Sequence, residues 1–195
     1  MKKQILFLHG FLSSGNSNKA SILRKYVENN NLPYEVFSPS IDDDITRSIY
    51  SIEEFIKEHM ISVDAFVGSS LGGYWSYRLF QKFKVPTILI NPVVNPKEII
   101  DKFAGKHTNP YTNNEFVVPS DLDNLDMDMY PLGKEDKKKF YIILGTADEV
   151  LDYHKALEFY RGCAVNVIEN ENHRIRDFQS CCTGILEFIE KSANN

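Results

Sequence analysis

The chain has 195 residues, a formal net charge of −5 at pH 7, 43% hydrophobic residues and 25% charged residues. This length is typical of one domain that buries about 70% of its unfolded surface, so we expect a single domain over residues 1–195. The negative charge, without a block of Lys and Arg, argues against binding to nucleic acid. No stretch approaches the roughly 20 apolar residues of a membrane span.

The amino terminus and the cysteines bear on location. Lys2 and Lys3 precede a short apolar run, which resembles the start of a signal peptide but is too short for its hydrophobic region. The cysteines are odd in number and lack C-x-x-C spacing; they are Cys163, Cys181 and Cys182. Free thiols are typical of a reducing compartment, so we expect a cytoplasmic protein.

Short apolar runs alternate with helical patterns along most of the chain. The runs that predict buried strands are residues 4–8, 34–38, 65–67, 86–90, 140–144 and 164–168. Strands that alternate with helices imply a parallel sheet with right-handed crossovers. The expected fold class is α/β, with about six parallel strands and helices on both faces in three layers.

The segment from Asn91 to Lys139 breaks this alternation and is rich in Pro, Asn and Asp. We expect an irregular insert near the active site, because long connections often act as lids or binding loops. Its apolar residues, among them Tyr111 and Phe116, must be buried somewhere. We predict that Tyr111 and Phe116 line a substrate pocket; the alternative is that the insert packs over an edge of the sheet.

Two acidic stretches are weighed as metal sites. The three acids at 42–44 precede a helix, where negative charge offsets the helix dipole, and we favour this capping role. Asp121, Asp123 and Asn124 lack the Gly and the distal Glu of an EF-hand loop. No metal site is therefore expected.

Residues 68–72 match G-x-S-x-G with Ser70 at the centre, between an apolar strand and a helical pattern. A serine at such a turn needs neighbours without a Cβ, which Gly68 and Gly72 provide. A Gly-rich turn that binds phosphate is the alternative, but the lysine of that motif is missing because Tyr74 follows Gly73.

A serine nucleophile needs a base and a carboxylate that orients the base. In a parallel sheet such residues follow the carboxyl ends of strands. Asp148 and His173 follow the fifth and sixth strands, and the order Ser70, Asp148, His173 is that of α/β hydrolases. The other histidines are weaker candidates: His59 and His154 fall on or beside helices, and His107 lies in the insert. Of the other acids, Asp152 and Asp177 are expected to cap helices.

An oxyanion hole in this arrangement uses the amide after the nucleophile and one from the loop after the first strand. Leu71 and Phe11 are the expected donors. His9 precedes Phe11 and either contributes to the substrate pocket or is a hydrogen-bonded histidine at its rim.

Several motifs together resemble a YqiA-type esterase of the α/β-hydrolase superfamily: His9-Gly10-Phe11, Gly68-Ser69-Ser70-Leu71-Gly72-Gly73-Tyr74, Asn109-Pro110-Tyr111-Thr112, Asp148-Glu149-Val150-Leu151-Asp152-Tyr153 and Asn172-His173. The resemblance implies a small intracellular serine hydrolase that acts on short acyl esters. It also implies Ser70 as nucleophile, Asp148 as acid and His173 as base. Arg174 departs from the small or apolar residue of the family pattern.

The expected function is that of a carboxylesterase which cleaves small acyl esters through an acyl-enzyme, without a cofactor. The expected partner is a small-molecule ester, with neither nucleic acid nor membrane, and oligomeric state is left open. A thioesterase or amide hydrolase on the same triad is one alternative. A non-catalytic ligand-binding protein on this scaffold is the other.

Overall fold

The computed structural model of the chain describes residues 2–120 and 127–193. Its centre is a six-stranded sheet of order β2-β1-β3-β4-β7-β8, in which all neighbouring strands run parallel. The strands are β1 (Lys3–Leu8), β2 (Tyr34–Phe37), β3 (Val63–Ser69), β4 (Thr87–Ile90), β7 (Phe140–Gly145) and β8 (Ala164–Ile168). The predicted parallel sheet and α/β fold class are confirmed.

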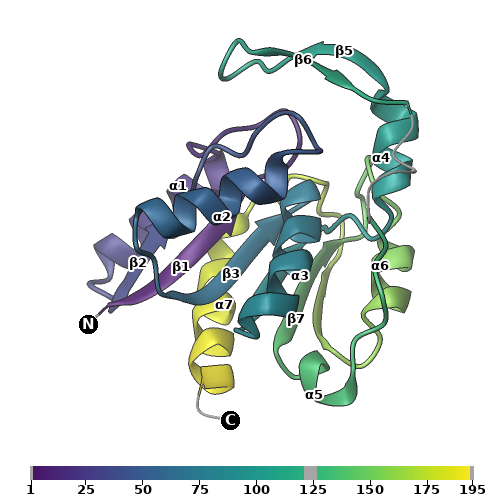
Figure 1. Cartoon of the computed structure of the whole chain (residues 1–195). Helices are drawn as coiled ribbons and strands as arrows, with labels where there is room; N and C mark the ends of the chain where they lie inside the picture. Colours follow the sequence, from purple (N-terminus) through teal and green to yellow (C-terminus); the bar gives the residue numbers. More distant parts are fainter. Residues whose placement is uncertain (1, 121–126, 194–195) are drawn as a thin grey trace.

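Helices cover both faces of the sheet (Figure 1). One face packs against α1 (Asn18–Asn29) and α7 (Phe178–Ala193). The other packs against α2 (Ser48–Glu58), α3 (Leu71–Phe83), α4 (Pro96–Phe103) and α6 (Tyr153–Phe159). Side chains along β1 alternate between these layers, with Ile5 and Phe7 in one core and Leu6 and Leu8 in the other. This burial on both faces is why central strands such as β1 and β4 read as apolar runs.

The segment from Asn91 to Lys139 is more regular than expected. It contains α4, an antiparallel hairpin of β5 (Gly105–Thr108) and β6 (Glu115–Val118), and the short α5 (Lys134–Lys137). The start of α4 has a sequence signal, because Asn95 caps it by accepting a hydrogen bond from the Lys97 amide at 3.2 Å and Pro96 occupies the first turn. The two strands are too short for an alternating pattern to stand out. Asp121, Asp123 and Asn124 lie outside the described residues.

The expected capping role of the acids at 42–44 is wrong. Helix α2 begins at Ser48 and has no acidic residue in its first turn. Asp44 instead accepts a hydrogen bond from the Thr46 amide at 2.9 Å, in the turn before the helix, and Asp43 binds Asn109 of the hairpin. Over residues 2–120 and 127–193, no cluster of three or more potential metal ligands is present.

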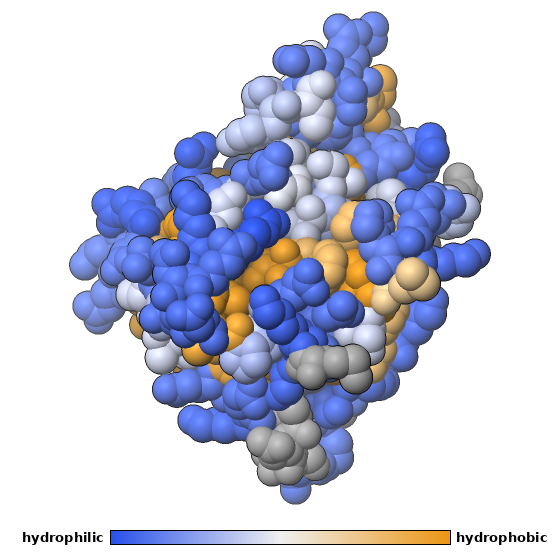
Figure 2. Space-filling model, turned by 90° about the vertical axis from the view of Figure 1, so that its left-hand side faces the viewer, coloured by the Kyte–Doolittle hydropathy of each residue, from blue (hydrophilic) through white to orange (hydrophobic). Residues whose placement is uncertain are grey.

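Hydrophilic residues cover most of the face in Figure 2, and hydrophobic residues show mainly in its middle. None of the helices in the described part of the chain has the length and apolar character of a membrane span.

Tyr160 carries a hydroxyl with no hydrogen-bond partner among the described residues, although the side chain is completely buried. Replacement by Phe removes this unsatisfied polar atom and keeps the ring. We expect Tyr160→Phe to raise the free energy of unfolding by about 1 kcal/mol, measured by denaturant unfolding.

Tyr77 is the matched control, because its ring also packs against Phe140 while its hydroxyl bonds to the Tyr130 backbone. Tyr77→Phe is expected to lower the free energy of unfolding by about 1 kcal/mol or more. Equal changes in the free energy of unfolding of the two variants would contradict the conclusion that the Tyr160 hydroxyl is unsatisfied.

Candidate active site

Ser70 stands at the turn between β3 and α3 with φ 56° and ψ −120°, a region that non-glycine residues rarely occupy. Backbone hydrogen bonds hold this conformation. The Ser70 amide donates to the carbonyl of Ile90 at 3.0 Å, and its carbonyl accepts from the amides of Gly73 at 2.9 Å and Val93 at 3.1 Å. The Ser70 backbone is therefore fixed at the carboxyl edge of the sheet.

The glycines of the turn are required by close packing. A Cβ on Gly68 would lie 2.3 Å from the hydroxyl of Ser76 and 2.4 Å from the carbonyl oxygen of Gly72. A Cβ on Gly72 would lie 2.1 Å from the carbonyl oxygen of Leu8. The loop after β1 thus rests directly on the start of α3. On the same loop, a Cβ at Gly10 would lie 3.1 Å from the Cβ of Ser70.

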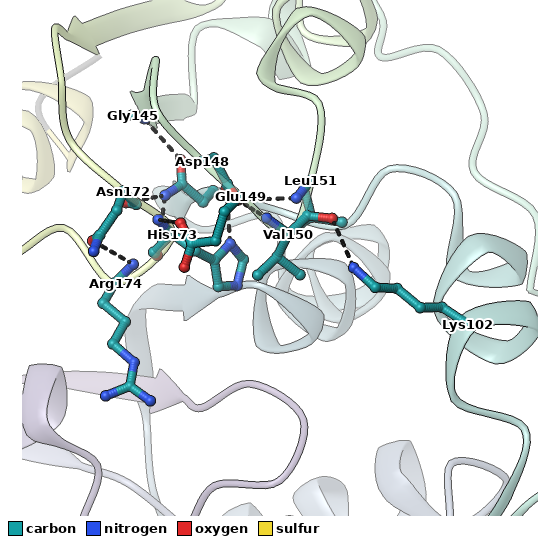
Figure 3. A network of polar contacts seen from close by, with 10 residues as sticks. Lys102, Gly145, Asp148, Glu149, Val150, Leu151, Asn172, His173 and Arg174 are labelled. Carbon is teal, nitrogen blue, oxygen red and sulfur yellow. Dashed lines mark hydrogen bonds and ion pairs between the residues drawn. The ribbon is translucent and has the colours of Figure 1, made fainter.

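His173 and Asp148 form a partly buried pair, with 2.7 Å between Nδ1 and Oδ2 (Figure 3). The Asp148 side chain is 1% exposed and that of His173 is 16% exposed. Since the carboxylate accepts at Nδ1, Nε2 is the nitrogen left to act on another group. His173 and Ser70 line one cavity of about 230 Å³. The structure therefore brings the three predicted triad residues to the same edge of the sheet.

The loop after β7 orients the acid of this pair. The second carboxylate oxygen of Asp148, Oδ1, accepts hydrogen bonds from the amides of Val150 at 2.8 Å and Leu151 at 2.9 Å. Next to it, Glu149 accepts a hydrogen bond from the backbone amide of His173 at 3.1 Å. That bond lowers the pKa of Glu149. The loop after β7, which carries Asp148, and the loop after β8, which carries His173, are therefore joined through backbone as well as side-chain contacts.

Asn91 is a positioning residue that sequence reasoning missed. It follows β4, has φ 41° and is 2% exposed. Its side-chain amide donates to the carbonyls of Asn172 at 3.2 Å and His173 at 3.1 Å, and its oxygen accepts from the Gly145 amide at 2.9 Å. It therefore joins the loop that carries Asp148 to the loop that carries His173. The sequence signal for this role was an apolar strand followed directly by an asparagine and then a proline, Asn91-Pro92.

His9 lines the cavity but is held by backbone on both sides of its ring. Nε2 accepts a hydrogen bond from the Ile41 amide at 3.0 Å, so Nδ1 carries the proton and donates to the Gly10 carbonyl at 2.9 Å. Burial lowers the pKa of His9, which keeps the ring neutral. Of the two roles predicted for His9, this geometry favours the hydrogen-bonded rim residue.

The two aromatic residues predicted to line the pocket have different positions. Tyr111 lines the cavity that contains Ser70. Phe116 does not line it; its ring packs behind Phe11, 5.8 Å away between centroids, in a cluster with Phe103 and His107. Phe116 thus supports the wall through Phe11, because the hairpin turns its side chain toward α4 and not toward Ser70.

Asn109, in the turn of the β5–β6 hairpin, connects the hairpin to the loops after β1 and β2. Its side chain is buried, at 1% exposure. Its amide donates to the Ser13 carbonyl at 2.9 Å and to Asp43 at 2.6 Å, while its oxygen accepts from the Tyr111 amide at 2.9 Å. The loops after β1 and β2 and the tip of the hairpin are joined at this one side chain. Tyr111 is placed at the cavity as a result.

The remaining candidates lie away from the cavity. Asp152 caps α6 by accepting from the His154 amide at 3.0 Å, as predicted. His154 is paired with Asp152, and His59 is exposed and stacked on Phe55. Asp177 accepts from the Ser180 amide at 3.4 Å in the first turn of α7.

The arrangement of the sheet, the turn at Ser70 and the loops at the carboxyl edge is that of the α/β-hydrolase fold. The fold is similar to that of Est1E from Butyrivibrio proteoclasticus, with a TM-score of 0.74 and 11% identity over 100% of this chain and 89% of that one. It is also similar to alpha/beta hydrolase domain-containing protein 10 from mouse, with a TM-score of 0.64 and 16% identity over 96% and 90% of the two chains. The esterase domain of a Rhodothermus marinus protein matches with a TM-score of 0.63 and 12% identity over 98% and 85%. At these identities the likeness concerns the fold.

The model of the uncharacterised protein family UPF0227 matches residues 4–190. The chain belongs to this family, which is the YqiA family that its motifs resemble.

Gly72 offers a test of the packing between α3 and the loop after β1. The Cβ of Gly72→Ala would overlap backbone oxygen atoms, so we expect the free energy of unfolding to fall by about 3 kcal/mol or more, measured by denaturant unfolding. Gly133→Ala is the control, because a Cβ there meets nothing within 4 Å. A Gly72→Ala protein as stable as the control would contradict this packing.

Proposed function

We propose that this protein is a serine esterase that cleaves small carboxylic esters through an acyl-enzyme. The observation that carries the proposal is the cavity that Ser70 and His173 both line. His173 is hydrogen-bonded through Nδ1 to the buried Asp148, which leaves Nε2 for the substrate side. A strained, glycine-flanked serine beside a histidine–carboxylate pair is the arrangement that activates a hydroxyl for attack on a carbonyl.

In the first half of the reaction, the Ser70 Oγ forms a bond to the ester carbonyl carbon while His173 Nε2 takes the hydroxyl proton. Asp148 stabilises the imidazolium and keeps it oriented. Collapse of the tetrahedral intermediate breaks the bond to the alcohol oxygen, and His173 returns the proton to that alcohol. Water then attacks the acyl-enzyme by the same route, which releases the acid and restores Ser70.

The negative charge on the tetrahedral oxygen needs donors that are already in place. Leu71 is the first residue of α3, where amide groups have no acceptor within the helix. Phe11 belongs to the loop that packs against this turn and lines the cavity. We assign the amides of Leu71 and Phe11 as the oxyanion donors, at about 3 kcal/mol of transition-state stabilisation each.

Cytoplasmic location is part of the proposal, supported by three free thiols. Burial raises the pKa of Cys163 to about 11 and that of Cys182 to about 12, so these thiols stay protonated at neutral pH. Thioesters and amides would react through the same steps.

A fluorophosphonate probe tests the nucleophile. Wild-type protein is expected to gain one probe mass by intact-mass measurement, and Ser70→Ala to gain none. Hydrolysis of a short-chain 4-methylumbelliferyl ester should fall roughly 10⁶-fold in kcat for Ser70→Ala. Ser69→Ala is the control, because Ser69 lines the same cavity but precedes the strained position. Labelling that persists in Ser70→Ala would refute the assignment.

The acid is tested by a pair of substitutions at neighbouring aspartates. Asp148→Asn is expected to lower kcat about 10⁴-fold, because the amide favours the wrong tautomer of His173. Asp152→Asn changes a helix cap, so its effect is expected on stability alone, at about 1 kcal/mol or less. Loss of activity in Asp152→Asn at unchanged stability would reverse these roles.

A further inference from the structure

Two cationic side chains line the cavity that contains Ser70, although the protein is acidic overall. Lys19 comes from the first turn of α1, and Arg174 directly follows His173. Within the described part of the chain, neither the Lys19 ammonium nor the Arg174 guanidinium has a hydrogen bond or an ion pair. Arg176, two residues further on, is by contrast paired with Glu171 at 3.6 Å.

The surroundings of Lys19 leave its charge uncompensated. Burial, and then the charge of Arg174, lower the pKa of Lys19 to about 8, against the opposite influence of Asp148 and Cys181. Asp148 is fully engaged with His173 and two backbone amides. A partly buried cation without a counterion is stabilised when an anion binds beside it.

The start of α1 adds to this positive region. Ser17 and Asn18 line the same cavity, and the first turn contains no acidic residue. Ser17 does not cap the helix, and its buried hydroxyl has no hydrogen-bond partner among the described residues. The amino end of a helix attracts anions, so a lysine in this turn is unfavourable for the helix itself. Lys19 thus departs from the usual charge preference at the start of a helix, and such a departure beside a cavity is typical of a functional position.

The Arg174 side chain extends away from Asp148 in Figure 3, toward the ribbon of the amino-terminal strand. It is exposed, whereas Lys19 is half-buried. The two charges therefore reach the same cavity from different elements, Lys19 from the first turn of α1 and Arg174 from the loop after β8.

We propose that Lys19, Arg174 and the start of α1 form a subsite for an oxyanion, a carboxylate or a phosphate, carried by the ester substrate. The inference rests on the proposed esterase function and narrows its substrate class to esters with a negative charge close to the scissile bond. Lys19 and Arg174 bind this charge and take no part in proton transfer.

Matched esters test the subsite. On the acyl side, 4-methylumbelliferyl hemisuccinate is compared with 4-methylumbelliferyl methyl succinate, which differs in charge. On the leaving-group side, 4-(butyryloxy)benzoate and 4-(butyryloxy)phenyl phosphate are compared with methyl 4-(butyryloxy)benzoate. In at least one arm, kcat/KM of the anionic ester is expected to exceed that of its neutral counterpart about tenfold. The arm that shows this identifies the position and kind of anion.

Variants assign the preference to these residues. Lys19→Met is expected to lower the ratio of anionic to neutral kcat/KM about tenfold, and Arg174→Gln to lower it less, because solvent screens an exposed charge. Within each variant the neutral ester is the reference, so a change in kcat/KM that both esters share leaves the ratio unaffected. Lys25→Met is the control: it removes an exposed lysine from the same helix, away from the cavity.

The pH dependence separates a charge effect from a change in packing. The preference for the anion should decline as pH rises through about 8, where the Lys19 ammonium loses its proton. The groups that act on the Lys19 charge are Arg174, Asp148 and Cys181, and His9, Tyr111 and His173 line the same cavity. Lys19→Arg should keep the preference and lose this decline, because the guanidinium stays charged.

The outcomes separate this inference from the proposed function. Turnover of neutral esters with labelling of Ser70, but no anionic preference in any arm, would overturn the subsite and leave the esterase intact. A preference that Lys19→Met and Arg174→Gln leave unchanged would also overturn it. If no ester is cleaved and Ser70 is not labelled, the esterase function fails and the subsite with it.

Discussion

Ser70 holds a backbone conformation that is unfavourable for a serine, and the geometry of the site depends on the contacts that keep it there. The Ser70 backbone is hydrogen-bonded to the end of β4 and to the first turn of α3. The start of α3 also packs against the end of β1 so closely that a Cβ on Gly72 would not fit. Strain of this kind persists only when the surrounding structure over-determines it. This conformation places Ser70 at the cavity, directly before the amino end of α3.

Polar side chains at the ends of strands join the loops around that turn. Asn91 connects the loops of the acid and the base, His9 connects the loops after β1 and β2, and Asn109 adds the hairpin to the same frame. Each is almost fully buried, and each satisfies backbone groups that irregular segments would otherwise leave unpaired. These three residues hold in place the loops that carry Ser70, Asp148 and His173.

The electrostatics of the cavity differ from those of the rest of the chain. The negative charges near Ser70 are held in hydrogen bonds, while the positive charges of Lys19 and Arg174 are left unpaired among the described residues. A protein with a net charge of −5 thus presents a positive region beside its candidate nucleophile. Such a region attracts anions and disfavours cations.

The sequence by itself determined the sheet, the glycine-flanked turn at Ser70 and the positions of Ser70, Asp148 and His173 after strands. These are local properties, because apolar runs, glycine spacing and positions after strands are set by neighbours in the chain. Only the tertiary structure decided that α4 and a hairpin fill the expected irregular insert, and that Phe116 faces Phe11 and not the cavity. It alone showed that Asn91 ties two distant loops and that Lys19 and Arg174 meet at one cavity. The physical reason is that the contacts of Asn91 join residues 54 and 81 positions apart, and Lys19 and Arg174 come from opposite ends of the chain. No pattern within a strand, turn or helix records which loops will face each other.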